Sequence, residues 1–320
     1  GGSSGGAAVA LACGLVPVAE GSDMGGSLRN PASFCNVVGF RPSPGRVPTW
    51  PSEMPWQTMA VQGPMGRSVA DAALLLSVIA GPDPRSPMAI EQPGTMFTGS
   101  LDRDLSGLRV AWAPDFGGAL SVDAAVVDTL APQVKVFEDL GCTVTEACPD
   151  LTGADEAFRI LRAWEFDIVF GQFRDEHPDK VKATIRWNVD EGRRLTTADL
   201  ARAEILHGEL FHRMREFFTR YDLLLLPTSQ VPPFDATLEY PTEVAGIAQS
   251  SYLDWMRASY YITTTGSPAI SVPGGFTTDG LPVGLQIVGP HHADLAVLQA
   301  GHAFEQATRV GARRPPVCEE

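Results

Sequence analysis

Lysine is scarce in this chain: only Lys135, Lys180 and Lys182 occur among 320 residues, so arginine carries nearly all of the positive charge. Acidic residues outnumber basic ones, and the formal net charge is −14. This balance argues against direct nucleic-acid binding, which needs a basic face to meet the phosphates. It also argues against docking on an anionic membrane.

Disulfide, metal-binding and membrane-spanning patterns are missing as well. The five cysteines form no Cys-x-x-Cys pair, and their odd number and scatter favour reduced thiols in a cytoplasmic protein. His207 and His212 are five residues apart, off a common helical face, while the adjacent His291 and His292 have no third ligand nearby, so we expect no metal. No uninterrupted apolar run is long enough to span a bilayer.

The apolar pattern predicts an α/β protein with a mixed central β-sheet covered by helices on both faces. Leu223–Leu226 has no polar alternation, which is typical of a strand buried on both faces. We expect one domain over residues 1–320. The predicted helices are 7–15, 27–35, 67–80, 123–141, 155–174, 197–220, 252–262 and 294–308, and the predicted strands are 15–19, 108–113, 142–146, 223–227, 269–272 and 283–288.

Two loops rich in glycine and serine stand near the start of the sequence, at 1–6 and 21–27. Glycines ahead of a serine allow the backbone to approach a ligand closely and to present its N–H groups to it. Ser27, at the end of the second loop, is placed to attack a carbonyl carbon while neighbouring N–H groups hold the oxyanion. The two loops together therefore indicate acyl transfer.

The first loop has three interpretations. The first is a cloning linker or flexible spacer. The second is a nucleophile elbow, because Gly1-x-Ser3-x-Gly5 matches G-x-S-x-G. The third is a loop that supplies a partner serine for Ser27. The elbow would make Ser3 the nucleophile of an α/β-hydrolase, with a late histidine such as His302 as its base.

Several motifs favour the third interpretation, because together they closely resemble the amidase signature family. They cover most of the chain and are densest at its two ends. The motifs are Gly1–Gly6, Gly21–Pro31, Phe34–Ser43, Gly63–Met65 with Arg67–Asp71, Ala269–Pro273 and Gly280–Gly289.

The resemblance implies a Ser–cis-Ser–Lys triad and a cofactor-free reaction. Ser27 corresponds to the nucleophile, and Ser3, after a cis Gly2–Ser3 bond, corresponds to the cis-serine. The backbone of Met24, Gly25 and Gly26, together with that of Ser27, corresponds to the oxyanion hole. The implied chemistry is attack by Ser27, release of ammonia or an amine, and hydrolysis of the acyl-enzyme by water.

Four further residues are candidates for supporting roles. Ser22 and Asp23 brace the second loop by hydrogen bonds or simply form a turn. For Arg29 a buried ion pair is favoured over a clamp for a substrate carboxylate. Ser4 hydrogen-bonds within the site or caps the following helix.

The family's lysine lies upstream of the first loop, where this sequence has no residue. Lys135, Lys180 and Lys182 stand in segments away from the matched motifs, and a lysine that accepts a proton must be buried enough to lose its charge. We therefore expect an amidase-signature domain that is incomplete at its N-terminus, and a 320-residue chain that is inactive or very weak.

The sequence thus predicts an amide hydrolase acting on a small carboxamide or a short linear or cyclic amide. The small-molecule amide is the expected partner, and a homodimer is left open. The alternatives are the amidase subunit of a glutamine-dependent tRNA amidotransferase and a remnant that only binds. Large aromatic residues could line the pocket, and Tyr260 and Tyr261 could form a wall of it.

Overall fold

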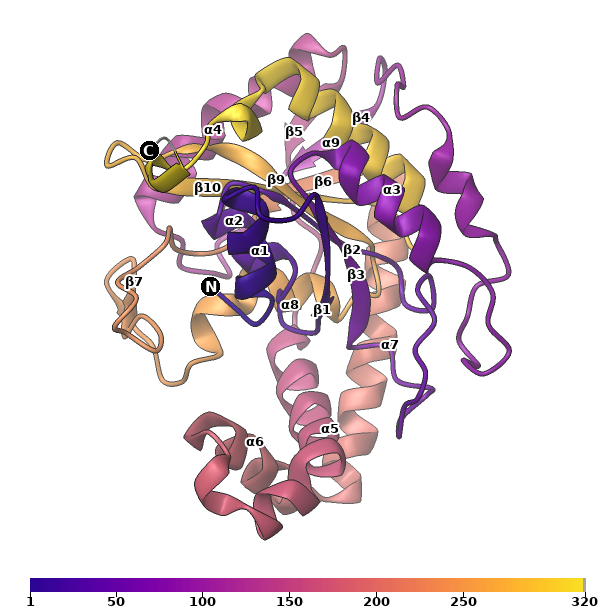
Figure 1. Ribbon diagram of the computed structural model, residues 1–320, viewed down its shortest axis with the longest axis vertical. Helices are drawn as coiled ribbons and strands as arrows, with labels where there is room; N and C mark the ends of the chain where they lie inside the picture. Colours follow the sequence, from indigo (N-terminus) through magenta and orange to yellow (C-terminus); the bar gives the residue numbers. More distant parts are fainter. Residues whose placement is uncertain (319–320) are drawn as a thin grey trace.

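The computed structural model describes residues 1–318, and an eight-stranded mixed sheet with helices on both faces forms its centre (Figure 1). The strand order is β1-β3-β2-β9-β10-β6-β4-β5, and β4 runs parallel to its neighbours β5 and β6 while the other pairs are antiparallel. The predicted fold class is confirmed. The strands are β1 Val18–Asp23, β2 Val38–Arg41, β3 Val61–Gly66, β4 Arg109–Trp112, β5 Thr143–Glu146, β6 Leu223–Pro227, β9 Ala269–Phe276 and β10 Pro282–Val288.

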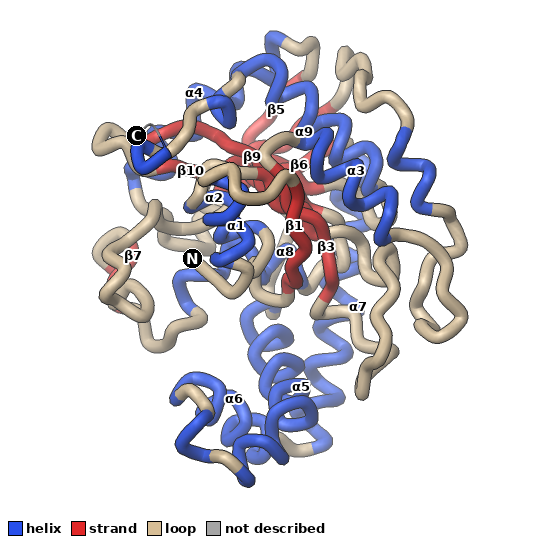
Figure 2. The backbone as a smooth tube through the Cα atoms, in the orientation of Figure 1, coloured by secondary structure: helices blue, strands red, loops and turns tan. Residues whose placement is uncertain are grey.

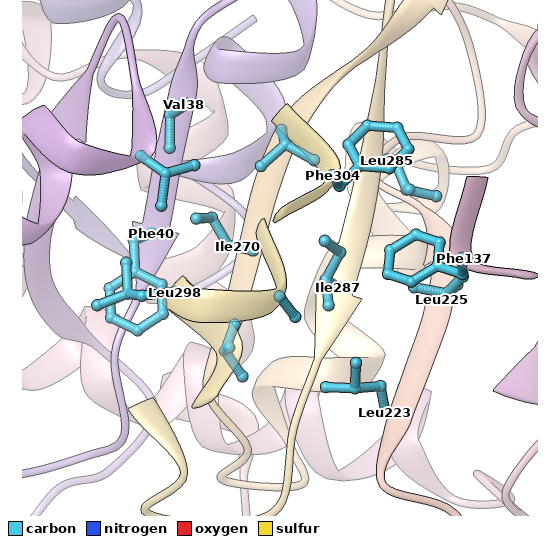
Figure 3. Packing of buried hydrophobic residues seen from close by; sticks show 14 of the residues in the cluster. Val38, Phe40, Phe137, Leu223, Leu225, Ile270, Leu285, Ile287, Leu298 and Phe304 are labelled. Atoms are coloured by element: carbon cyan, nitrogen blue, oxygen red, sulfur yellow. The ribbon is translucent and has the colours of Figure 1, made fainter. Parts of the chain in front are cut away.

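One face of the sheet is covered by α3 (Val69–Ile79), α4 (Ala124–Asp139) and α9 (Asp294–Thr308). Figure 3 shows side chains of these helices packed against the central strands. Phe137 of α4 stacks on Phe304 of α9 with ring centroids 5.5 Å apart. Burial of each such large apolar side chain contributes about 1.5–3 kcal/mol, so this cluster is a main source of stability.

The opposite face carries the helices that surround the candidate site. They are α1 (Gly5–Ala12), α2 (Arg29–Phe34), α5 (Ala154–Glu176), α7 (Thr197–Arg220) and α8 (Arg257–Thr263). Strand β6 contributes to the cores on both faces of the sheet. Leu223 and Leu225 belong to the core on the first face, and Leu224 and Leu226 to the core on the opposite face. Its predicted two-sided burial is confirmed.

A helical arm extends from the body of the molecule (Figure 2). It consists of α6 (Ala183–Arg194) and the parts of α5 and α7 that pack beside it. A separate hairpin of β7 (Glu243–Val244) and β8 (Ile247–Ala248) completes the strands. Within residues 1–318 no helix is long and apolar enough to cross a bilayer.

Several predicted boundaries were wrong. The first strand covers Val18–Asp23 rather than 15–19, so three of the seven residues of the loop predicted at 21–27 are strand. Strands β2 and β3 and helix α6 were not predicted. Strand β3 reads Val-Gln-Gly-Pro-Met-Gly and has no apolar alternation, because the sheet buries nearly all of it. The segment predicted as a helix over 252–262 is a 3₁₀ turn at Asp254–Met256 followed by α8.

Candidate active site

Ser27 lies in a tight loop between the end of β1 and the start of α2, and its side chain is half-buried. Gly26 precedes it with φ +103°, in the region that favours glycine. A Cβ atom on Gly26 would lie 2.4 Å from both Asn30 Nδ2 and Ser259 Cβ. Glycine at position 26 is therefore required by the local backbone and by the packing of α8 against the loop.

The Asp23 carboxylate holds this loop in place. Its Oδ1 accepts a hydrogen bond from the Gly26 amide at 3.0 Å, and its Oδ2 accepts from the amides of Leu28 and Arg29 at 3.2 and 3.4 Å. One side chain at the end of a strand thus fixes the backbone on both sides of Ser27. The bracing interpretation of Asp23 matches these contacts.

Arg29 and Asp23 form a fully buried ion pair behind the loop. Arg29 Nη2 is 2.8 Å from Asp23 Oδ1, and Arg29 Nη1 donates to Gln286 Oε1 at 2.6 Å. Arg41 also contacts Asp23, through both its carboxylate and its carbonyl oxygen. Burial would raise the pKa of Asp23, but the two guanidinium groups and the amide donors outweigh burial and lower this pKa well below its usual range. Arg29 is occupied inside the protein, which fits the predicted ion pair rather than a substrate clamp.

The first serine loop meets the second one directly. The Ser4 amide donates to the Ser27 carbonyl oxygen at 3.2 Å, and Ser4 Oγ donates to the Ser22 carbonyl oxygen at 3.5 Å. Gly21 makes this approach feasible, because a Cβ there would lie 2.4 Å from Ser4 Oγ. Ser4 stands at the start of α1, but its side chain caps nothing.

Ser3 is therefore held one residue away from the backbone contact to Ser27. Its side chain is exposed, and the peptide bond between Gly2 and Ser3 is cis, as the family resemblance implies. Solvent can reach both serines, which any role in catalysis requires.

The amides of the loop differ in what they bind. Gly26 donates to Asp23, so in this conformation its N–H group is not available to an oxyanion. Within residues 1–318 the amides of Met24, Gly25 and Ser27 have no hydrogen-bond acceptor. Amides without a protein acceptor beside a nucleophile are what an oxyanion hole requires.

The three lysines are all exposed. Lys135 Nζ binds Asp139 at 2.7 Å on α4, and that hydrogen bond raises the pKa of Lys135, opposite to the change that a neutral base requires. Lys182 Nζ pairs with Glu239 at 2.6 Å. These positions agree with the expectation that none of the three is the family's catalytic lysine.

His302 does not lie with Ser3. It belongs to α9, on the face of the sheet opposite α2, and its Nε2 is 3.6 Å from Asp102 Oδ1. The elbow interpretation with His302 as base is therefore wrong. In the described part of the chain no three His, Cys, Asp or Glu side chains are grouped to hold a metal ion.

A wall of side chains beside the loop was only partly predicted. Phe158 of α5 would lie 3.3 Å from a Cβ on Gly25, and it stacks on Tyr260 with centroids 4.0 Å apart. Arg162, one turn further along α5, donates from Nη1 to Met24 Sδ at 3.0 Å. The sequence pointed to Tyr260, whereas Phe158 and Arg162 gave no signal beyond their place on an amphipathic helix.

The protein is a mixed sheet covered by helices, in which two glycine-serine loops meet beside a buried Asp–Arg pair. Residues 1–298 match the family model described as Amidase, and this chain belongs to the amidase signature family. An acylamidase of Rhodococcus erythropolis is 37% identical over 323 residues, which cover 99% of this chain and 66% of that protein. The A-subunit of the glutamyl-tRNA(Gln) amidotransferase of Lactiplantibacillus plantarum is 33% identical, covering 99% of this chain and 69% of that protein.

Solved structures give the same result. A bacterial aryl acylamidase of the amidase signature family superposes with a TM-score of 0.88 at 31% identity, covering 98% of this chain and 68% of the other. A 6-aminohexanoate cyclic dimer hydrolase in complex with substrate also has a TM-score of 0.88, at 26% identity, covering 99% of this chain and 70% of the other. The chain thus spans about two thirds of the length of these relatives.

Proposed function

We propose that this chain provides the nucleophile and the oxyanion site of an amide hydrolase. Ser27 is the nucleophile, Ser3 relays its proton, and the amides of Met24, Gly25 and Ser27 bind the oxyanion. The observation that carries the proposal is the hydrogen bond from the Ser4 amide to the Ser27 carbonyl oxygen, which joins the two serine loops beside unpaired amides. Ser22, Asp23 and Arg29 position this loop and do not react.

The reaction begins when Ser27 Oγ bonds to the amide carbon and gives its proton to Ser3, whose own proton passes to a base. The tetrahedral oxyanion is then stabilised by about 3 kcal/mol for each well-placed donor. Its C–N bond breaks, and the leaving nitrogen takes back a proton. Water next hydrolyses the Ser27 ester, which releases a carboxylic acid and restores the serine.

The base is the part of the triad that these residues do not supply. All three lysines are exposed, and two of them are paired with carboxylates. We therefore place the catalytic lysine outside these 320 residues and regard residues 1–320 as part of one amidase-signature domain. The chain by itself is then inactive or very weak.

A small carboxamide or a short linear or cyclic amide is the proposed substrate. The acylamidase relative is 37% identical, and the Phe158–Tyr260 stack gives the loop an apolar neighbour. The mechanism requires no cofactor, no metal and no nucleic acid. A cytoplasmic location is the one we propose, and the oligomeric state is left to measurement by light scattering.

A second candidate is the A-subunit of a glutamyl-tRNA(Gln) amidotransferase, because several proteins of that name are 32–33% identical to this chain. The sequence comparison favours the hydrolase, since the acylamidase of Rhodococcus erythropolis is 37% identical to this chain and the amidotransferase subunit of Lactiplantibacillus plantarum 33%. Gel filtration with and without the other amidotransferase subunits separates the two, because only the second candidate forms a stable complex.

Covalent labelling tests the proposed nucleophile. A fluorophosphonate should modify Ser27, and the rate of labelling should increase as pH rises, because hydroxide takes the place of the missing base. Ser27→Ala should abolish the adduct and Ser3→Ala should reduce it, whereas Ser100→Ala, at an exposed serine, should change nothing. An adduct on Ser3 in place of Ser27 would contradict the proposed nucleophile, and no adduct at any pH would indicate a remnant that only binds.

A further inference from the structure

Arg162 lies against the loop that carries the proposed oxyanion donors. Its Nη1 donates to Met24 Sδ at 3.0 Å, and its Nη2 donates to the Tyr252 hydroxyl at 3.0 Å. The side chain is half-buried and belongs to α5, which passes beneath β1 and α8 before it enters the arm (Figure 1). Only the Met24 side chain therefore lies between this guanidinium group and the loop that carries Ser27.

No salt bridge pairs the charge of Arg162 within residues 1–318, although the carboxyl group of Glu165 lies near enough to interact with it electrostatically. The neighbouring arginines of α5 are paired, Arg159 with Asp155 and Asp254, and Arg174 with Asp175 and Asp190. Arg162 has no carboxylate within ion-pair distance in the described part of the chain. Its Nε is buried and has no hydrogen-bond partner.

Aromatic rings surround this guanidinium group instead of carboxylates. Its carbon atom lies 4.1 Å from the ring centroid of Phe166, and 5.9 and 6.0 Å from those of Phe158 and Tyr252. An aromatic ring attracts a guanidinium group through the face of the ring. The N–H groups at the edge of the guanidinium plane can then still donate hydrogen bonds to another acceptor. Nη1 and Nη2 each carry a second N–H group besides the one given to Met24 or Tyr252, and two such groups in an apolar setting are suited to bidentate binding of a carboxylate.

Glu165 is the carboxyl group that could compete for Arg162. It follows one turn later on α5, and its Oε2 is buried without a partner. Burial raises the pKa of Glu165 to about 7, and the nearby Arg162 only partly opposes this. Glu165 lines a cavity with Gln57 and Gln62 and forms no ion pair with Arg162 in this conformation.

We propose that Arg162 binds a carboxylate of the substrate, so that the site takes amides that carry a carboxylate elsewhere in the molecule. This inference rests on the proposed function, because it assumes that the amide sits at the Ser27 loop. Arg162 then determines specificity and takes no part in bond breaking. Met24 links the two sites, since it accepts from Arg162 and belongs to the proposed oxyanion loop.

The test measures equilibrium binding rather than turnover. A short series of ω-amido acids of increasing chain length is titrated calorimetrically into the chain carrying Ser27→Ala, and each acid is matched by its uncharged methyl ester. We expect the best acid to bind roughly tenfold or more tightly than its ester. Arg162→Gln should abolish this preference, and Arg162→Lys should retain part of it.

Two further variants control for charge and for folding. Arg174→Gln removes a positive charge from the same helix but far along the arm, and should keep the preference. Glu165→Gln removes the competing carboxyl group and should strengthen binding of the acid. Circular dichroism must show that Arg162→Gln is folded; if it is not, the comparison rests on Arg162→Lys and Glu165→Gln.

Three results would overturn the inference. These are equal binding of acid and ester by the parent chain, an unchanged preference in Arg162→Gln, and an equal loss for both ligands, which would mean that Arg162 only positions Met24. Labelling of Ser27 by the fluorophosphonate needs no carboxylate. Its success alongside any of these results would refute the role of Arg162 and leave the proposed function standing.

Discussion

The Ser27 loop and the helical arm use the same pairing of aspartate with arginine in opposite environments. Asp23 and Arg29 are fully buried, and Asp23 also fixes three amides of the loop. In the arm Arg193 pairs with Asp167 and Asp175, and all three side chains remain about one third to one half exposed. A buried pair with many hydrogen bonds sets one geometry, whereas exposed pairs mainly keep a surface soluble.

The largest expected effect is that of Asp23→Ala. This change leaves Arg29 and Arg41 buried without their carboxylate, and loss of one partner of a buried pair costs about 3–5 kcal/mol. It also frees the amides beside Ser27 from their acceptor, so the loop loses its conformation. Both the free energy of unfolding and the rate of fluorophosphonate labelling should therefore decrease. Urea unfolding measures the first effect and mass spectrometry the second.

The matched control lies in the arm. Arg193→Gln removes a charge that is shared by two exposed aspartates, and solvent screening makes that loss small. Its urea midpoint should stay close to that of the parent chain. Equal destabilisation by the two variants would refute the contrast between loop and arm.

Gly26→Ala should have the next largest effect. A methyl group there meets Asn30 and Ser259 at 2.4 Å, and the positive φ adds strain of about 1–3 kcal/mol. The loop must shift, so labelling of Ser27 should slow even at temperatures where the variant is folded. A variant with parent-like stability and labelling would show that the loop is not held against α8 as described.

Glu165→Gln should change how stability depends on pH. Burial raises the pKa of Glu165 from 4.5 to about 7, so between these values the folded chain binds more protons than the unfolded chain. The contribution of Glu165 to stability is therefore present below about pH 4.5 and is lost as pH rises towards 7, with a slope of at most ~1.4 kcal/mol per pH unit.

Unfolding curves collected from pH 4 to pH 8 check this prediction. The parent chain should lose stability relative to Glu165→Gln across that window, and the difference should level off above it. Parallel curves for the two proteins would mean that Glu165 is solvated in the folded chain.

The Ser27 loop was predictable because its chemistry is local. Gly26 and Ser27 are adjacent, and Asp23 reaches amides only three to six residues ahead, so spacing along the chain already limits their geometry. The partner loop needed the family resemblance, because nothing in the spacing of Ser3 and Ser27 requires them to meet.

The wall beside the loop was not predictable in the same way. Arg162 meets Met24 across 138 residues of sequence, and Arg29 meets Gln286 across 257. Such contacts depend on how α5 and β10 pack, which no local pattern encodes. The missed strands have the same origin, since β2 pairs with β3 and with the distant strand β9.

The smallest expected effect is a gain in stability on α7. Gly208 is exposed within α7, and a Cβ there meets no atom within 4 Å. Gly208→Ala should therefore stabilise the chain by about 0.5–1 kcal/mol, because alanine loses less backbone entropy in a helix. The same substitution at Gly26 has the opposite sign, since there the backbone and its neighbours exclude a methyl group. Thermal unfolding of the two variants side by side measures this difference, and a destabilised Gly208→Ala would show that α7 is packed at this position as closely as the loop.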